Sequence, residues 1–136
     1  MYLSGGHKTV KNILKRGAFT VSMGDAEHAA AWDYVGIESD KVARAGFHVT
    51  KSEHVDAPVI DELPLALECK LVSYDEETRL LTGEIVNVSV DERALDENGK
   101  LAVEKLHVIT FDYANHGYYV LGEKVASAFE DGEKFK

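Results

Sequence analysis

Two alternating stretches, joined by a short acidic turn, constrain the fold of this chain more than any other feature. In residues 65–74 apolar side chains recur at every second position, namely Leu65, Leu67, Cys69 and Leu71. A period of two is typical of a β-strand, and residues 80–90 repeat it. The intervening residues 75–78, Asp-Glu-Glu-Thr, have the composition of a turn. We therefore expect an antiparallel hairpin on which the remaining elements pack.

The segments before and after this hairpin predict short helices and short strands. Pro58 and Pro64 interrupt residues 47–64, where we expect one short strand at most. The other expected elements are, in chain order, a helix capped by Thr9 and ended by Gly17, a strand over 18–23, an alanine-rich helix over 26–35 capped by Asp25 and ended by Gly36, a helix over 40–45, one helical turn over 91–95, strands over 107–112 and 118–121, and a helix over 123–129. The expected fold class is mainly β with short helices (α+β).

The length of 136 residues and the apolar content of 45% predict one globular domain over residues 1–136. A net charge of −9 disfavours nucleic acid and anionic membranes as partners, because excess Lys and Arg bind both. The sequence has no long apolar run and no leader pattern, so we expect a cytoplasmic protein without a membrane span. Cys69 is the only cysteine, and the six histidines never recur three or four residues apart. We expect neither an internal disulfide nor a metal site.

Residues 32–47 combine a helix stop, a new helix cap and a lysine. Gly36 favours the left-handed conformation that ends a helix, and Ser39 is a good N-cap for the next one. Lys41 would then lie in a first helical turn, where the helix dipole disfavours a cation. Two interpretations remain open. Lys41 is an ordinary solvated lysine, or it contacts an anionic ligand together with Ser39 and backbone N–H groups.

The cysteine, serine and acidic residues of the sequence form no pattern that is typical of a catalytic site. Cys69 lies within a strand on its apolar side, and no G-x-S-x-G elbow occurs, so we expect a buried free thiol. The acidic pairs at 76–77 and 91–92 lie in turns, where charges are solvated. A dense aromatic group favours packing in a core or an interface, with stacking on a flat ring system as the alternative; it comprises Phe111, Tyr113, Tyr118 and Tyr119.

The order of these signals resembles the flavin reductase-like family, the split-barrel FMN-binding proteins that include flavoredoxins. The pieces that carry the resemblance are His7-x-Thr9-x3-Ile13, Gly17-x-Phe19-x-Val21, Asp33-Tyr34-x-Gly36, Ser39-Asp40-Lys41, Gly46-Phe47, Ala57-Pro58, Leu67-Glu68-Cys69-Lys70, Gly83-Glu84-Ile85-Val86, Asp91-Glu92, Tyr118-Tyr119-x-Leu121-Gly122-Glu123 and Ala128-Phe129. The resemblance implies an antiparallel split β-barrel, bound FMN and a homodimer. It also implies either NAD(P)H-dependent reduction of free flavin or electron transfer to a protein redox partner.

The same resemblance suggests which residues bind the cofactor. Thr9 is similar to the threonine that holds the flavin phosphate, and Lys41 is similar to a lysine that reaches the cofactor beside Ser39. Phe111 is similar in placement to an aromatic residue near the flavin, with Tyr113 as the neighbouring alternative. Where the family often has a histidine before the Gly-Glu strand motif, this chain has Thr78 and Arg79, and Arg79 could donate to an anion.

Family members carry further strands before the His-x-Thr helix, whereas this chain begins almost on it. We therefore expect an N-terminally truncated split barrel whose strand edges must be covered, paired or blunted. A fragment, a naturally short protein and cover supplied by dimerisation would each account for the difference. The alternative function is a split-barrel module without cofactor that acts as a dimeric binding or structural protein.

Overall fold

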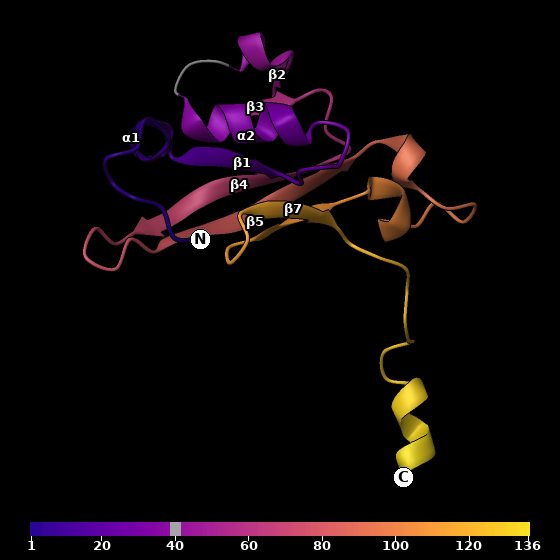
Figure 1. Cartoon of the computed structure of the whole chain (residues 1–136). Helices are drawn as coiled ribbons and strands as arrows, with labels where there is room; N and C mark the ends of the chain where they lie inside the picture. Colours follow the sequence, from indigo (N-terminus) through magenta and orange to yellow (C-terminus); the bar gives the residue numbers. More distant parts are fainter. Residues whose placement is uncertain (39–41) are drawn as a thin grey trace.

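The computed structural model describes residues 1–38 and 42–136, and Figure 1 shows how their helices and strands are arranged. The two α-helices are α1 (Lys8–Arg16) and α2 (Ala29–Ile37). The strands are β1 (Ala18–Ser22), β2 (Val49–Lys51), β3 (Pro58–Ile60), β4 (Leu65–Tyr74), β5 (Leu81–Val90), β6 (Ile109–Asp112) and β7 (Gly117–Val120). Single 3-10 turns cover Ala43–Ala45, Glu92–Ala94, Val103–Leu106 and Asp131–Phe135.

The predicted hairpin is confirmed and forms the largest sheet described. β4 and β5 pair antiparallel, with Leu65 opposite Val90 and Tyr74 opposite Leu81. β1 pairs antiparallel with the other side of β4, which gives the strand order β1-β4-β5. Two further antiparallel pairs, β2-β3 and β6-β7, lie beside this sheet. The expected class, mainly antiparallel β with short helices, is therefore confirmed.

The main hydrophobic core lies between α1 and this sheet. Its buried members are Ile13 from α1, Phe19 from β1, Cys69 from β4 and Leu81 from β5. Gly83 packs directly against the ring of Phe19, and a Cβ at this position would lie 2.4 Å from Phe19 Cζ. Only glycine leaves enough room for the ring there.

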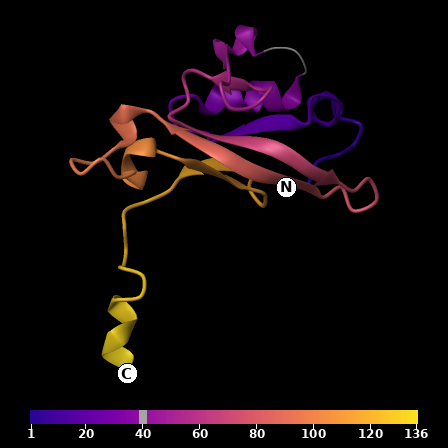
Figure 2. The same ribbon diagram turned by 180° about the vertical axis from the view of Figure 1, so that it is seen from behind.

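The views from front and back show how the other elements surround this sheet. α2 and the β2-β3 pair lie over β1 (Figures 1 and 2), and a hydrogen bond of 3.1 Å from the Tyr118 hydroxyl of β7 to Asp33 joins α2 to the β6-β7 hairpin. Residues 121–136 extend away from the sheets as a tail (Figure 2). Among the described helices, none combines the length and the apolar character needed to cross a lipid bilayer.

The helix boundaries differ from those predicted at both helices. His7, not Thr9, is the N-cap of α1, because His7 has extended backbone angles and Thr9 lies inside the first turn. α2 begins at Ala29, because Asp25 accepts hydrogen bonds from the backbone N–H (2.9 Å) and the ring Nδ1 (2.8 Å) of His28, which holds residues 25–28 in a turn. Gly36 lies within α2, which ends one residue later at Ile37.

Two other segments also differ from the prediction. Residues 47–64 contain two strands, β2 and β3, which pair only with each other over three residues and so carry too short a pattern to recognise. The helix predicted over 123–129 is absent, and the tail instead forms a 3-10 turn over Asp131–Phe135. Val125 and Phe129 are fully exposed, so an amphipathic helix there would have no surface on which to pack. The predicted helix over 40–45 falls partly outside the described residues, and its last three residues form a 3-10 turn.

Candidate functional site

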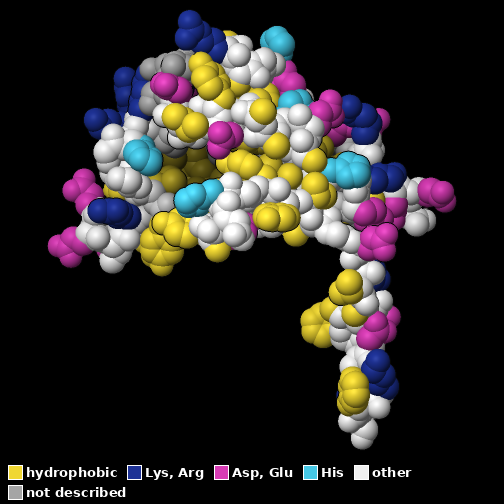
Figure 3. All heavy atoms as spheres, viewed as in Figure 1, with side chains coloured by type: hydrophobic (Ala, Val, Ile, Leu, Met, Phe, Trp, Pro, Cys, Tyr) yellow, Lys and Arg dark blue, Asp and Glu magenta, His cyan; other side chains and the backbone are white. Residues whose placement is uncertain are grey.

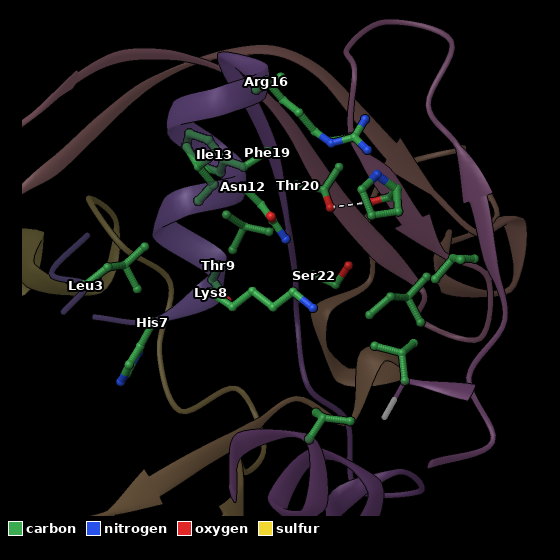
Figure 4. Close-up of a pocket in the computed structure, with 18 of the residues that line it drawn as sticks. Leu3, His7, Lys8, Thr9, Asn12, Ile13, Arg16, Phe19, Thr20 and Ser22 are labelled. Carbon is green, nitrogen blue, oxygen red and sulfur yellow. Dashed lines mark hydrogen bonds between the residues drawn. The ribbon is translucent and has the colours of Figure 1, made fainter. Parts of the chain in front are cut away.

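A deep cleft opens between α1, β1, the C-terminal end of α2 and the β2-β3 pair. Its volume is about 1430 Å³. Figure 3 shows this face hollowed beside α1 and below α2, with apolar side chains at the bottom of the hollow. Figure 4 shows the residues that α1 and β1 contribute to the wall. Helix α1, strand β1 and the β2-β3 pair all contribute side chains to this concave surface, and we treat it as the candidate site.

One wall of the cleft is a polar stripe along α1. Lys8, Asn12 and Arg16 are four residues apart and all line the cleft, because side chains at this spacing lie on one face of a helix. Thr9 lines the cleft beside Lys8 (Figure 4). The opposite face of α1 carries Val10, which is 1% exposed, into the interior. The amphipathic pattern of α1 therefore orients its nitrogen donors toward the cleft.

The N-terminal end of α1 is suited to an anion. The first turn contains Lys8 and Thr9 and no acidic residue, while the basic residues Lys15 and Arg16 lie in the last turn. The positive end of the helix dipole and the exposed backbone N–H groups attract negative charge at a helix start. The side chain of His7 forms no capping hydrogen bond to this turn within the described structure. The hydroxyl of Thr9 and the ammonium of Lys8 add side-chain donors at the same place.

The other walls of the cleft are mostly apolar. Leu3, Phe19, Trp32 and Val35 line it, so a flat ring could be enclosed beside the polar stripe. The indole N–H of Trp32 is buried and has no hydrogen-bond partner among the described residues. A Cβ added at Gly24 would lie 3.1 Å from this indole nitrogen, so the N–H is enclosed by the protein and is not open to the cleft. The cleft thus combines donors on α1 with an apolar wall, which suits a molecule with both a phosphate and a flat ring, as FMN has.

The structure brings only part of the predicted site together. Thr9 lines the cleft, whereas Ser39 and Lys41 lie outside the described residues. Arg79 lies in the β4-β5 turn with a left-handed φ of 61°, and its carbonyl accepts a hydrogen bond of 2.9 Å from the N–H of Leu3, a residue of the cleft wall. Arg79 is therefore next to the cleft but is not among the described residues that line it.

The two predicted aromatic residues lie in the β6-β7 hairpin. Phe111 is 49% exposed and Tyr113 is 84% exposed, and neither is among the described residues that line the cleft. The ring of Phe111 stacks parallel to that of His116 at 6.4 Å and lies 5.4 Å from that of Tyr118. The hydroxyl of Tyr118 donates a 3.1 Å hydrogen bond to Asp33 of α2, which holds the hairpin close to this helix. These rings form an exposed aromatic cluster, which is typical of a surface that packs against another element or another subunit.

Three polar residues that α1 contributes to the cleft were not predicted, namely Lys8, Asn12 and Arg16. Their spacing of four residues was a usable signal, because it marks one face of the first helix opposite its apolar residues. That this face borders a cleft depends on β2 and β3, which are far away in sequence.

Two buried ionisable groups lie in the sheet behind the cleft. Burial raises the pKa of Glu68, but hydrogen bonds from Ser52, Ser89 and Asn87 outweigh burial and leave the pKa below its usual range. Glu68 is therefore a charged residue that is 2% exposed. Cys69 is a free cysteine that is 3% exposed, which confirms the expected buried thiol, and this burial raises its pKa.

Comparison with known proteins relates this fold to flavin reductase like domains and flavoredoxins. A family model described as "Flavin reductase like domain" matches residues 2–122. The structure of the flavoredoxin of Desulfovibrio vulgaris (Miyazaki F) is similar, with a TM-score of 0.90 and 37% identity over 96% of this chain and 73% of that one. The flavoredoxin from Methanosarcina acetivorans gives a TM-score of 0.85 and 25% identity over 98% of this chain and 74% of that one.

A curated relative extends beyond the matched region. An uncharacterized protein of Aquifex aeolicus (strain VF5) is 32% identical over 107 residues, which cover 74% of this chain. The match covers 55% of that relative, so the chain spans about half of its length.

Proposed function

Because the chain belongs to the family of flavin reductase like domains, we propose that it binds FMN in the cleft beside α1. In this proposal the protein acts as a flavoredoxin-type flavin reductase or electron carrier. The observation that carries the proposal is the stripe of donors on α1, with Thr9 and Lys8 at the positive end of the helix and an apolar wall facing them. When bound, FMN supplies the hydride and electron transfer that side chains cannot provide.

In this proposal, polar residues of the cleft bind the phosphate and apolar residues enclose the ring system. The Thr9 hydroxyl, the Lys8 ammonium and the Asn12 amide hold the phosphate, since charge-assisted hydrogen bonds to an anion are the strongest of their kind. The apolar wall, which includes Trp32 and Val35, encloses the ring system and excludes water from it. The family resemblance adds Ser39, Lys41, Arg79, Phe111 and Tyr113 as residues that contact the cofactor.

The proposal includes a homodimer. One edge of β5 pairs with β4. Along its other edge, within the described structure, residues 1–3 form backbone contacts with Leu80 and Leu81 only. Ile85 and Val88 of this edge strand are 55% and 48% exposed. Together with the exposed rings of the β6-β7 hairpin they provide an apolar surface of the kind that a second subunit covers. In the dimer the rings of the hairpin would have a partner against which to pack.

Flavin binding is tested by titrating the purified protein with FMN and following flavin fluorescence and the visible absorption bands. The proposal predicts saturable binding with one flavin per chain. A folded protein that remains colourless and does not bind added FMN would favour the alternative, a dimeric module without cofactor. A steady-state assay with NADH or NADPH and free flavin then separates the two activities, because an electron carrier turns over only when a protein redox partner is added. Light scattering at micromolar concentration tests the dimer, and a monomer would contradict it.

A further inference from the structure

At the Arg16 end of the polar stripe, a carboxylate of the protein itself pairs with the cations. The carboxylate of Asp56 lies 3.1 Å from the guanidinium of Arg16 and 3.5 Å from the ammonium of Lys51. All three residues line the cleft. Two cations therefore share a single carboxylate at one end of the site, while Thr9 and Lys8 lie at the other end.

The backbone holds Asp56 firmly although its side chain is half exposed. Its neighbours Val55 and Ala57 are 8% and 4% exposed and pack with Ala18 of β1. The turn is closed by hydrogen bonds from the N–H of Ser52 to the carbonyl of Ala57 and from the N–H of Val55 to the Ser52 hydroxyl oxygen.

The hydroxyl of Ser52 in turn donates to the carboxylate of Glu68. Glu68 also accepts hydrogen bonds from Asn87 and Ser89 of β5. A buried charged network thus anchors the turn to the main sheet, and the turn presents Asp56 to the cleft.

We infer that Asp56 is a built-in counter-ion that competes with the phosphate of the ligand and sets how strongly the cleft binds anions. Arg16 follows Thr9 by about 10 Å along the helix axis, at about 1.5 Å per residue. This separation is close to the Debye length of about 10 Å at 0.1 M salt, so the charge of Asp56 still acts at the phosphate end. Removal of the carboxylate also frees Arg16 and Lys51 to face the ligand. The inference rests on the proposed flavin site, and it assigns Asp56 a role in ligand selectivity.

The test compares Asp56→Asn with Asp61→Asn, which removes the same charge beside β3. Asp61 is exposed and is not among the described residues lining the cleft, although it accepts a hydrogen bond of 3.1 Å from Thr50, which does line the cleft. For Asp56→Asn we expect FMN to bind up to about twofold more tightly, because a unit charge about 10 Å from the phosphate acts weakly through water and salt. Riboflavin, which lacks the phosphate, should bind as it does to the parent, and Asp61→Asn should bind both flavins like the parent. The gain for FMN should disappear at about 1 M salt, where the Debye length is about 3 Å.

A second measurement keeps this test separate from the proposed function. Inorganic phosphate should raise the melting temperature of Asp56→Asn more than that of the parent or Asp61→Asn, whether or not flavin binds. If no variant binds FMN but this difference is seen, the proposed function fails and the role of Asp56 stands. The inference is overturned if neither FMN affinity nor the phosphate effect changes in Asp56→Asn, if riboflavin gains equally, or if Asp61→Asn behaves in the same way.

Discussion

The contact between Gly83 and Phe19 predicts that Gly83→Ala destabilises the protein. The added methyl would lie 2.4 Å from Cζ and 2.8 Å from Cε1 of Phe19, and 3.2 Å from the carbonyl oxygen of Lys70. Phe19 is 7% exposed and packed among Ile13 and Leu81, so its ring cannot move aside freely. Overpacking of this kind costs about 1–3 kcal/mol. The expected sign is diagnostic, because Gly→Ala without a clash would stabilise by about 0.4–1 kcal/mol through the unfolded chain.

Thermal unfolding followed by circular dichroism measures this effect. With an unfolding entropy of about 2.1 cal/mol/K per residue, a loss of 1 kcal/mol lowers the melting temperature of a chain of this length by roughly 3.5 °C. Gly83→Ala should therefore melt about 3–10 °C below the parent. Gly36→Ala is the matched control, because nothing lies within 4 Å of its added Cβ in α2, and it should melt higher than the parent.

A double-mutant cycle identifies the clash as the cause. Phe19→Leu shortens the side chain that the new methyl would meet, so Gly83→Ala should cost less in the Phe19→Leu background than in the parent. The contact of Gly83 with the Phe19 ring is refuted if Gly83→Ala is neutral or stabilising in the parent, or if its cost is equal in both backgrounds.

Three further predictions use simpler assays. Hydrogen bonds from Arg93 lower the pKa of Asp91 to about 2, so its stabilising contribution is present above its ordinary pKa and lost as the pH falls through about 2. Asp91→Asn should then melt at a lower temperature than the parent at neutral pH, and its melting temperature should fall less than that of the parent when the pH is lowered to about 2. Equal falls in melting temperature would contradict this. Cys69 should react with a thiol reagent only as fast as the protein unfolds, since burial keeps its thiol protonated and covered; rapid labelling of the native protein would show an open core. Lys41→Ala should weaken FMN binding about tenfold to hundredfold if Lys41 contacts the phosphate or a flavin oxygen, and unchanged affinity would leave it a solvated lysine.

The hairpin was predictable because its signal is local and repeated. Leu65, Leu67 and Cys69 give β4 its period of two, and an acidic turn follows directly, although Ala66 and Glu68 on the other face of the strand are buried as well. The helix boundaries were less predictable, since the cap at His7 depends on its backbone conformation and not on its side chain. The tail was also mispredicted from a local pattern. Residues 123–129 have an amphipathic sequence, but no other part of the described structure lies against their apolar side chains.

The cleft depended on contacts between distant segments. Thr9 was predicted from family resemblance, and its neighbours Lys8 and Asn12 could have been found from their spacing on the first helix. Asp56 reaches Arg16 although the two residues are 40 positions apart in the sequence. The turn that carries Asp56 is held in place by the buried Glu68 network. No periodicity in the sequence indicates that pairing.

The most direct test of the central claim compares FMN with riboflavin, which differs only by the phosphate, on the parent and on two α1 variants. Lys8→Ala removes a donor from the cleft, while Lys15→Ala removes the same charge from a residue of α1 that is not among the described residues lining the cleft. The account predicts that the parent and Lys15→Ala bind FMN more tightly than riboflavin. Lys8→Ala should lose about tenfold to hundredfold in FMN affinity, the value of a charge-assisted hydrogen bond, with riboflavin unaffected. Equal affinity of the parent for the two flavins, or equal losses in both lysine variants, would show that the phosphate does not bind at the start of α1.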